Sequence, residues 1–149
     1  MTTKALRIRD AVVELLTAST CGGVPAERIY LDISHAIEAT FPSIAVELGD
    51  EIPPQRNTVT RLDRQVIVKV QVISAATTGL GAIDATTSAD PVVAEVSRRI
   101  MADVSLGGLS FDIQEQDTQR QREETGRSVL MTTLNFSVDF STSELSREN

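Results

Sequence analysis

The chain has 149 residues, of which 41% are hydrophobic and 23% are charged, and its formal net charge is -7. This length fits one domain with a sizeable core, and the composition is that of a globular protein rather than a disordered or membrane-spanning one. The acidic charge argues against tight binding to nucleic acid or to anionic lipid, because both require a basic surface. Cys21 is the one cysteine and cannot form an intramolecular disulfide, and charged residues near the start occupy the place of a signal peptide's apolar run. We therefore expect a protein that is used or assembled in the cytosol.

The first expected element is an amphipathic helix over residues 3–17, where apolar side chains recur at helical spacing between charged ones. Residues 20–25 then break the helix, because two glycines open the backbone and a proline prevents a further turn. Residues 28–33 are typical of a short strand. Residues 34–40 are typical of a short helical turn, which Ser34 is expected to cap.

Two strands are expected next. Residues 41–51 suggest a strand that follows a proline and ends in a polar turn and a loop containing Pro53 and Pro54. Residues 61–73 alternate apolar and polar side chains, which indicates a central strand because successive side chains point to opposite faces of a sheet. The face expected in the core comprises Leu62, Val66, Val68, Val70 and Val72. The face expected to meet solvent or another protein comprises Arg61, Asp63, Gln65, Lys69 and Gln71.

The middle of the chain is expected to form a connector and a second helix. Residues 75–89 are mostly small and offer too little large apolar surface for a core element, so they predict a flexible connector. Asp90-Pro91 is typical of a helix start, with an N-cap residue followed by proline, and apolar residues then recur at helical spacing to about Val104. Gly107-Gly108 should end this helix, and residues 109–113 should begin a third strand.

The last part of the chain should form a long hairpin and a closing strand. Residues 114–127 are almost wholly polar or charged, which is typical of a hairpin tip. Residues 129–142 alternate again and predict the final strand, whereas residues 143–149 suggest a frayed tail. Taken together, the elements predict one α+β domain over residues 1–149. Its sheet should be mostly antiparallel, with about four strands, and two helices should pack on one face.

No arrangement in the sequence points to catalysis or to a cofactor. Cys21 and the single histidine, His35, could be written as nucleophile and base, but activation requires a positioned pair and nothing places them together. Gly79-Leu80-Gly81 lacks the third glycine of a dinucleotide site and the Gly-Lys-Ser/Thr of a phosphate loop, so it indicates a flexible loop. One histidine and one cysteine exclude the familiar structural zinc patterns. Asp84 and Asp90 could share a divalent cation with a neighbouring subunit, although Asp90 is more simply a helix cap.

Five segments in chain order carry a resemblance to a known family. Residues 6–16 match its opening helix, and Phe41–Val46, read as Phe-Pro-Ser-Ile-Ala-Val, match its Phe/Leu-Pro-Ala-Ile/Val-Ala-Val strand. Residues 64–73 match its long alternating strand, residues 90–104 its second helix and residues 129–142 its terminal strand. On these motifs the chain resembles the minor tail protein U, or tail terminator, family of long-tailed bacteriophages.

The resemblance implies a structural virion protein without catalytic residues or cofactors. Members of the family form a ring, usually hexameric, that caps the finished tail tube, stops its polymerisation and presents an attachment face to the head and neck. The implied partners are copies of the same chain, the tail tube protein and a head–tail connector or neck protein. The implied location is the head-proximal end of the virion tail, after assembly in the host cytoplasm and away from membranes. The chain departs from the family in residues 75–89 and 114–127.

The polar hairpin is expected to lie at a protein interface. Residues 114–127 lack large apolar side chains and therefore do not hold a core, yet they mix acidic with basic residues. Such mixed charge suits a salt-sensitive contact between subunits or with the tube, and a solvated hairpin is the alternative. The residues expected at the interface are Arg120, Arg122, Arg127, Glu123 and Glu124.

The bore of the expected ring should be acidic. DNA must pass through a tail channel without sticking, and each lysine or arginine held against phosphate favours retention. Six copies would carry a formal charge of about -42, six times the -7 of one copy, and a hydrated bore is one place where this charge is tolerable. The residues expected to line the channel are Glu47, Asp50 and Glu51.

Other functional classes are compatible with the same composition. A head–tail adaptor or neck ring would use the same structural features and differs only in which ring the protein joins. A monomeric cytosolic binding module is a further alternative, and an enzyme is more distant because no residue pattern supplies a chemical step.

Overall fold

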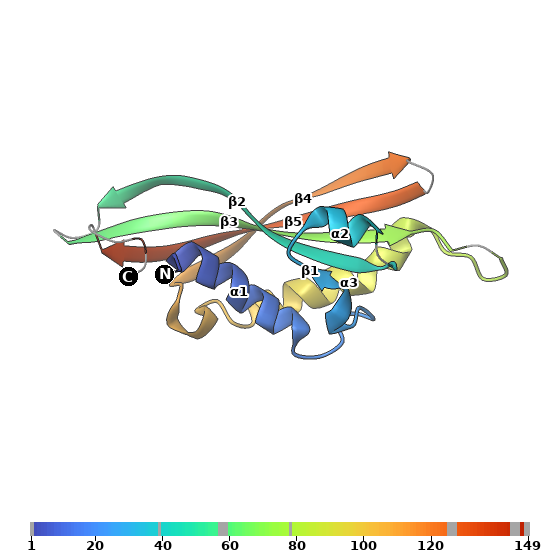
Figure 1. Cartoon of the computed structure of the whole chain (residues 1–149), viewed down its shortest axis with the longest axis horizontal. Coiled ribbons are helices and arrows are strands. Elements are labelled where there is room, and N and C mark those ends of the chain that lie inside the picture. Colours follow the sequence, from blue (N-terminus) through green and yellow to red (C-terminus); the bar gives the residue numbers. More distant parts are fainter. Residues whose placement is uncertain are drawn as a thin grey trace.

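The computed structural model describes residues 2–38, 40–56, 60–77, 79–124, 128–143 and 147. Figure 1 shows a long, twisted sheet with two helices, α1 and α3, on one face and a short helix, α2, on the other. The first half of the chain comprises α1 (Lys4–Thr17), the 3-10 helix η1 (Ala26–Arg28), β1 (Ile29–Tyr30), α2 (Ile33–Glu38) and β2 (Ser43–Arg56). The second half comprises β3 (Arg61–Ala75), α3 (Ala85–Met101), the 3-10 helix η2 (Leu106–Gly108), β4 (Asp112–Glu124) and β5 (Ser128–Ser143).

The five strands form one sheet in the order β1-β2-β3-β5-β4. β1 pairs with β2 in parallel, and the other pairs are antiparallel. β3 and β5 pair along their whole length, from Arg61 opposite Ser143 to Ala75 opposite Val129. The α+β class, the mostly antiparallel sheet and the two covering helices are therefore confirmed, with five strands in place of about four.

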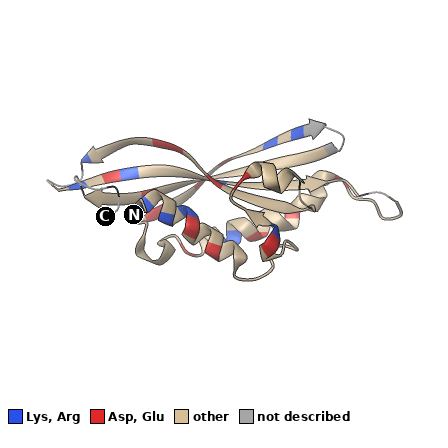
Figure 2. Cartoon of the chain, in the orientation of Figure 1, with Lys and Arg blue, Asp and Glu red and all other residues tan. Residues whose placement is uncertain are grey.

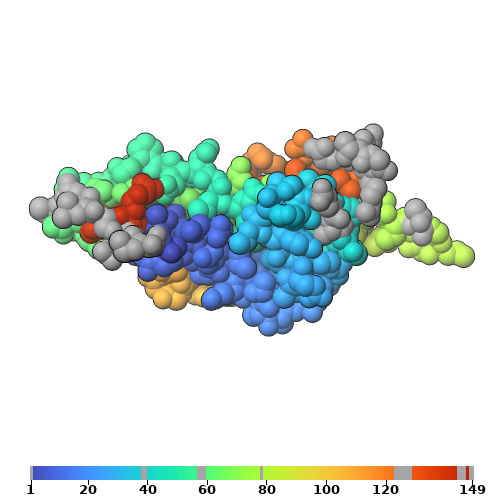
Figure 3. Space-filling view, viewed as in Figure 1, coloured from blue at the N-terminus to red at the C-terminus, as the bar shows by residue number. Residues whose placement is uncertain are grey.

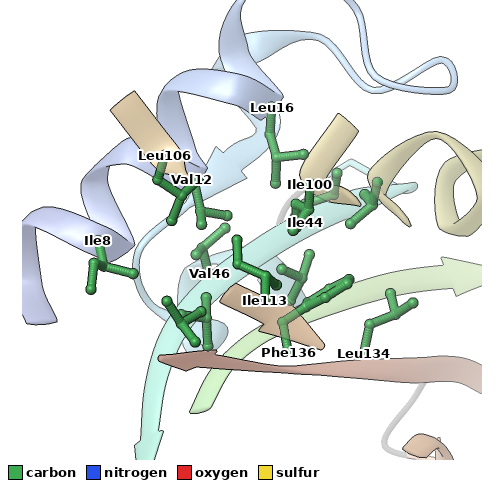
Figure 4. Close-up of a cluster of buried hydrophobic side chains, with 14 of the residues drawn as sticks. Ile8, Val12, Leu16, Ile44, Val46, Ile100, Leu106, Ile113, Leu134 and Phe136 are labelled. Carbon is green, nitrogen blue, oxygen red and sulfur yellow. The ribbon is translucent and has the colours of Figure 1, made fainter. Parts of the chain in front are cut away.

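The main core lies between α1, α3 and the sheet (Figure 4). Helical spacing places Ile8, Val12 and Leu16 on the buried side of α1, and Val92, Val96 and Ile100 on the buried side of α3. The sheet contributes alternate residues of β3 and β5, which are Val66, Val68, Val70, Val72, Leu134, Phe136, Val138 and Phe140. Period two therefore assigned the core face of both strands correctly.

α2 covers one end of the opposite face, which we call the outer face of the sheet. Ala36 of α2 packs there in a second cluster with Ala45, Ile73 and Val129. Ser34 does not cap this helix as expected. Instead, the Asp32 carboxylate accepts a hydrogen bond from the Ser34 backbone N–H at 2.9 Å. Because Asp32 precedes the first turn, its side chain reaches a backbone donor that has no partner within the helix.

α3 begins at Ala85, six residues before Pro91, the first helical residue that was expected. The N-cap is Asp84, whose Oδ1 accepts a hydrogen bond from the Thr87 backbone N–H at 2.7 Å. Pro91 therefore lies inside the helix, and the helix ends at Met101 rather than Val104. The small residues that suggested a connector instead allow close packing, because Ala85 and Ala89 are buried against the sheet.

β2 continues through Pro53 and Pro54, which were expected in a loop. Beyond its short pairing with β1, the outer edge of β2 pairs with no strand in the described part of the chain. Proline is tolerated on such an edge because the N–H that it lacks is not needed for a sheet hydrogen bond there. The pairing with β3 also shifts register twice, between Leu48 and Glu51 and again between Ile52 and Gln55. Such bulges accommodate proline by locally interrupting the ladder.

The polar residues from Gln114 to Glu124 form strand rather than a hairpin tip. They belong to β4 and pair with β5, with one register shift between Glu115 and Thr118. The turn that joins the two strands, residues 125–127, lies outside the described residues. The strand begins at Asp112, not at residue 109, and β5 extends to Ser143, where the tail was expected to begin.

Candidate assembly surfaces

The outer face of the sheet is mostly polar where α2 does not cover it. It carries the second set of alternating side chains from β3 and β5, including Gln65, Lys69, Asn135 and Asp139. Most of these side chains are half-buried or buried by their neighbours, so the face is well packed although it lacks a covering layer. A packed, polar and uncovered sheet face can meet water or a polar partner.

Two open hollows lie on this face. The first, of about 270 Å³, is lined by Ile52, Pro53, Gln55, Asp63, Arg64, Gln65, Phe111 and Asp139. The Gln65 amide donates a hydrogen bond to the Asp139 carboxylate at 2.8 Å, which ties β3 to β5 inside it. The second, of about 250 Å³, is lined by Asp50, Ile67, Lys69, Gln116, Asp117, Gln119 and Asn135. Four of these lining residues are aspartates, and two, Arg64 and Lys69, are basic.

The three carboxylates expected in the channel do not lie together. Glu47 is on the outer face, but its carboxylate accepts a hydrogen bond from the Ile33 backbone N–H at 2.9 Å and so holds the start of α2. Asp50 is exposed and lines the second hollow. Glu51 is opposite Val66, on the side of α1 and α3, and pairs with Arg147. The structure instead places Asp50 and Asp117 in the lining of one hollow, at bulges in β2 and β4 that sequence alone does not reveal.

Two of the five expected interface residues have described side chains. Arg120 and Arg122 are exposed on β4, opposite Thr132 and Leu130 of β5, and therefore face the side that carries α3. Arg120 lines a small hollow of about 20 Å³ with residues of α3. Hydrogen bonds from Thr87 hold the pKa of Asp84 below its usual value, and the positive charge of Arg122 contributes in the same direction. The side chains of Glu123 and Glu124, and the whole of Arg127, lie outside the described residues.

β4 is an edge strand with an unpaired outer side. Its residues from Gln114 to Arg122 are exposed, and no other described strand pairs with it beyond β5. Exposed edges are templates for further pairing unless charge, proline or bulges protect them. The mixed charges of β4, like Pro53 and Pro54 of β2, are such protections against indiscriminate pairing.

A loop before α3 projects from one end of the molecule (Figure 3). We call residues 77 and 79–83 the projecting loop. Its base is closed by a hydrogen bond from the Thr77 backbone N–H to the Ile83 carbonyl at 3.0 Å, and by one from the Ile83 N–H to the Thr77 hydroxyl at 2.8 Å. Leu80 is at its tip and is fully exposed. The small residues of this segment predict only a flexible connector, and the hydrogen-bonded base is a feature of the tertiary structure.

The residues considered for chemistry are far from one another in the fold. Cys21 is buried in the main core, where burial raises the pKa of its thiol, whereas His35 is exposed on α2 on the other side of the sheet. A nucleophile and its base must be within hydrogen-bond reach, so these two residues do not form such a pair. Asp84 is occupied as the cap of α3, and the described residues contain no cluster of metal-binding side chains. No described helix is both long and apolar enough to cross a membrane.

These features define an α+β protein whose long sheet has one apolar face covered by helices and one mostly polar face. Its outer strand edges are exposed, and the described residues form no catalytic site. No protein-family model matches the chain, and no curated protein sequence matches it. The fold is similar to that of a solved chain described as "Virion of native gene transfer agent (GTA) particle". The TM-score is 0.54 at 15% sequence identity, and the match covers 91% of this chain and 95% of that chain. At this identity the similarity concerns the fold, and it extends over nearly the whole of both chains.

Proposed function

We propose that the chain is a structural component of a phage-like virion and, within that class, a ring-forming tail terminator. In this role it caps the tail tube, stops tube polymerisation and provides the attachment face for the head and neck. The observation that carries the proposal is the fold similarity to a chain of a gene transfer agent virion over nearly the full length of both chains. The sequence resemblance to tail terminators, which follows the same order of helices and strands, supports the finer assignment.

The shape of the molecule suits a subunit that contacts neighbours on two sides. Figure 1 shows the paired ends of β2 and β3 and those of β4 and β5 reaching toward opposite ends of the long axis. The two ends differ in sequence and structure, so contact between copies is heterologous. Heterologous contacts close into a ring when the rotation between neighbouring copies is right. Six copies, the usual number in the resembling family, are the proposed ring.

The outer face is the part of the surface best suited to line the bore. Four aspartates line its two hollows, namely Asp50, Asp63, Asp117 and Asp139, against two basic residues. An acidic wall repels phosphate and does not hold DNA during passage. The proposed bore therefore keeps Asp50, one of the three channel residues predicted from the sequence. Asp63, Asp117 and Asp139 are added to the proposed lining. The basic residues of β3 on this face, Arg61 and Lys69, are too few to reverse the sign.

The remaining partners follow from the terminator role. One rim of the ring contacts the tail tube protein, and the other contacts a head–tail connector or neck protein. Arg120 and Arg122, exposed on the edge strand β4, are proposed contact residues at one of these surfaces or between copies, together with Arg127, Glu123 and Glu124. The chain performs no chemical step in this role, acts at the head-proximal end of the tail and is assembled in the host cytoplasm.

The deciding experiment is electron microscopy of particles from a host in which a nonsense mutation stops synthesis of this chain. Overlong tails are expected, and supply of the intact chain should restore the normal length. Tails of normal length that are not attached to heads would contradict the terminator role and identify a head–tail adaptor or neck ring. Normal particles would exclude both roles and favour a binding module outside the virion.

A second experiment tests the bore. Asp50→Lys and Asp117→Lys together should leave tail length unchanged but slow DNA ejection, because the reversed charges attract phosphate. Glu27→Lys is the control, since Glu27 is exposed on η1 and lines neither hollow. Equal ejection rates for the two sets of variants, or a map of the tail tip with basic side chains lining a six-fold bore, would remove the electrostatic argument.

A further inference from the structure

The tip of the projecting loop is an apolar side chain held away from the rest of the protein. Leu80 has a relative exposure of 110%, the largest among the exposed large apolar residues described. It lies between Gly79 and Gly81, whose φ angles of 94° and 77° are readily adopted by glycine and rarely by other residues. Hydrogen bonds between Thr77 and Ile83 close the base of the loop. Closure of the base thus holds the Leu80 side chain in water, where a partner has access to it.

The same chain carries a groove that could receive such a side chain. It has a volume of about 320 Å³, lies between α1 and η2, and is lined by Ala11, Glu14, Leu15, Ala18, Asp103, Leu106 and Gly107. Most of these residues are small or apolar, and the two charged ones, Glu14 and Asp103, are both acidic. The carboxylates disfavour an acidic occupant, whereas an uncharged apolar side chain meets no such opposition.

A copy cannot fill its own groove with its own loop. The loop precedes the first residue of α3, and Asp103 and Leu106 follow the last. α3 has 17 residues, so at a rise of about 1.5 Å per residue its two ends lie roughly 25 Å apart. Any occupant of the groove that comes from the loop must therefore belong to another copy.

We propose that the projecting loop of one copy inserts Leu80 into the groove between α1 and η2 of the next copy. The proposal rests on the ring proposed above and assigns one of its contacts. Charge supports it: each copy carries a formal charge of -7, whereas residues 75–83 contain no charged residue, so this segment approaches a second copy without added repulsion. Figure 2 shows the loop free of acidic and basic residues in its described part. The donor and acceptor surfaces differ, which makes the contact head-to-tail, as ring closure requires.

Association of the purified full chain tests the contact directly. Leu80→Asp should weaken self-association by about 10- to 100-fold in sedimentation velocity, as expected when one buried leucine is lost from a contact. Its thermal unfolding should match that of the unaltered chain, because Leu80 contributes no buried surface within one copy. Leu31→Asp is the matched control: Leu31 is another leucine that is 52% exposed, and it lies in neither the loop nor the groove. This control should associate normally.

Cysteine cross-linking identifies the two sides of the contact. One chain carries Leu80→Cys and a second, mass-tagged chain carries Ala18→Cys, both in a Cys21→Ala background. Oxidation of the mixture should give a disulfide-linked pair of one tagged and one untagged chain. Replacing Ala18→Cys with Ala94→Cys, which is exposed on α3 outside the groove, should abolish most of the product.

The outcomes separate this contact from the terminator role, which is decided by tail length. If Leu80→Asp assembles like the unaltered chain, or if Ala94→Cys cross-links as well as Ala18→Cys, the contact is wrong while the terminator role is unaffected. A chain that stays monomeric at every concentration and gives no pair between Leu80→Cys and Ala18→Cys also overturns the contact. Normal ring formation by Leu80→Asp with lost binding to the tail tube would assign the loop to the tube instead.

Discussion

Arg99 joins the two helices that cover the sheet. Replacing it should lower the free energy of unfolding more than replacing any neighbouring charged residue. Its guanidinium lies on α3 with only 10% of the side chain exposed. It donates hydrogen bonds to carbonyl oxygens at and after the end of α1, namely those of Leu15 at 3.2 Å, Leu16 at 3.1 Å, Ser19 at 3.1 Å and Thr20 at 2.7 Å. Its Nε donates to Glu95 at 2.8 Å. Carbonyls at the end of a helix have no partner within it, and a cation there also interacts favourably with the negative end of the helix dipole.

Arg99→Ala removes all of these donors at once. A hydrogen bond from a charged group contributes about 1.5–3 kcal/mol, but bonds that share one guanidinium are not additive, so we expect a loss of about 3 kcal/mol in the free energy of unfolding. With a urea dependence of about 2 kcal/mol per molar, the unfolding midpoint should fall by about 1.5 M. Arg99→Lys should recover only part of this loss, because an ammonium group cannot reach the same spread of acceptors as the planar guanidinium.

Arg98, the residue before Arg99, supplies a matched control. It also donates to Glu95, but its side chain is 66% exposed and has no described bond to α1. Arg98→Ala should leave the urea midpoint close to that of the unaltered protein, since exposed ion pairs contribute little. Urea unfolding followed by circular dichroism would measure both variants. Equal midpoints for Arg98→Ala and Arg99→Ala would refute the reasoning that Arg99 ties α1 to α3.

Three further predictions concern register, pH and the absence of chemistry. Val68→Asp should lower the free energy of unfolding by about 3 kcal/mol or more, because Val68 is fully buried, whereas Lys69→Ala on the outer face should change it by about 0.5 kcal/mol or less; equal urea midpoints would show that the register is wrong. Hydrogen bonds from the two arginines of α3 lower the pKa of Glu95 from 4.5 to about 2, so its stabilising contribution is present above pH 4.5 and is lost as the pH falls toward 2. The difference in Tm between the unaltered protein and Glu95→Gln should accordingly shrink across that range, and a constant difference would contradict the pairing. Cys21→Ala and His35→Ala should each support normal tail assembly because neither residue is assigned a chemical step, and loss of infectious particles with a normally folded variant would overturn that assignment.

Patterns that depend on one element at a time were readable from the sequence. The alternation of β3 and β5 identified their buried faces, because burial on one side of a sheet is recorded at every second residue. The helical spacing around Val12 and around Val96 likewise predicted α1 and α3, and both of these residues are on the buried faces of their helices. These patterns also determined the α+β class, since two half-polar strands and two amphipathic helices can bury their apolar faces only against each other.

Signals at the ends of elements were less reliable, because tertiary contacts decide them. Asp90-Pro91 has the form of a helix start, yet α3 extends back to Asp84 because Ala85 and Ala89 gain burial against the sheet. Pro53 and Pro54 predicted a loop, yet β2 continues through them because its outer edge there has no described partner strand. In both places the local preference was real, and packing or strand position outweighed it.

The candidate surfaces depended most on the tertiary structure. The odd positions of β3 and β5 already placed Asp63 and Asp139 on the outer face, but only the tertiary structure, with its bulges in β2 and β4, shows that Asp50 and Asp117 line one hollow. The sequence shows that residues 75–83 are small and uncharged, and it does not show that Leu80 is presented at the tip of a braced loop. Sequence periodicity reports which side of an element is buried by its own chain. Which exposed side chains share a surface depends on sheet order, register and loop closure, and these are set by contacts between residues far apart in the chain.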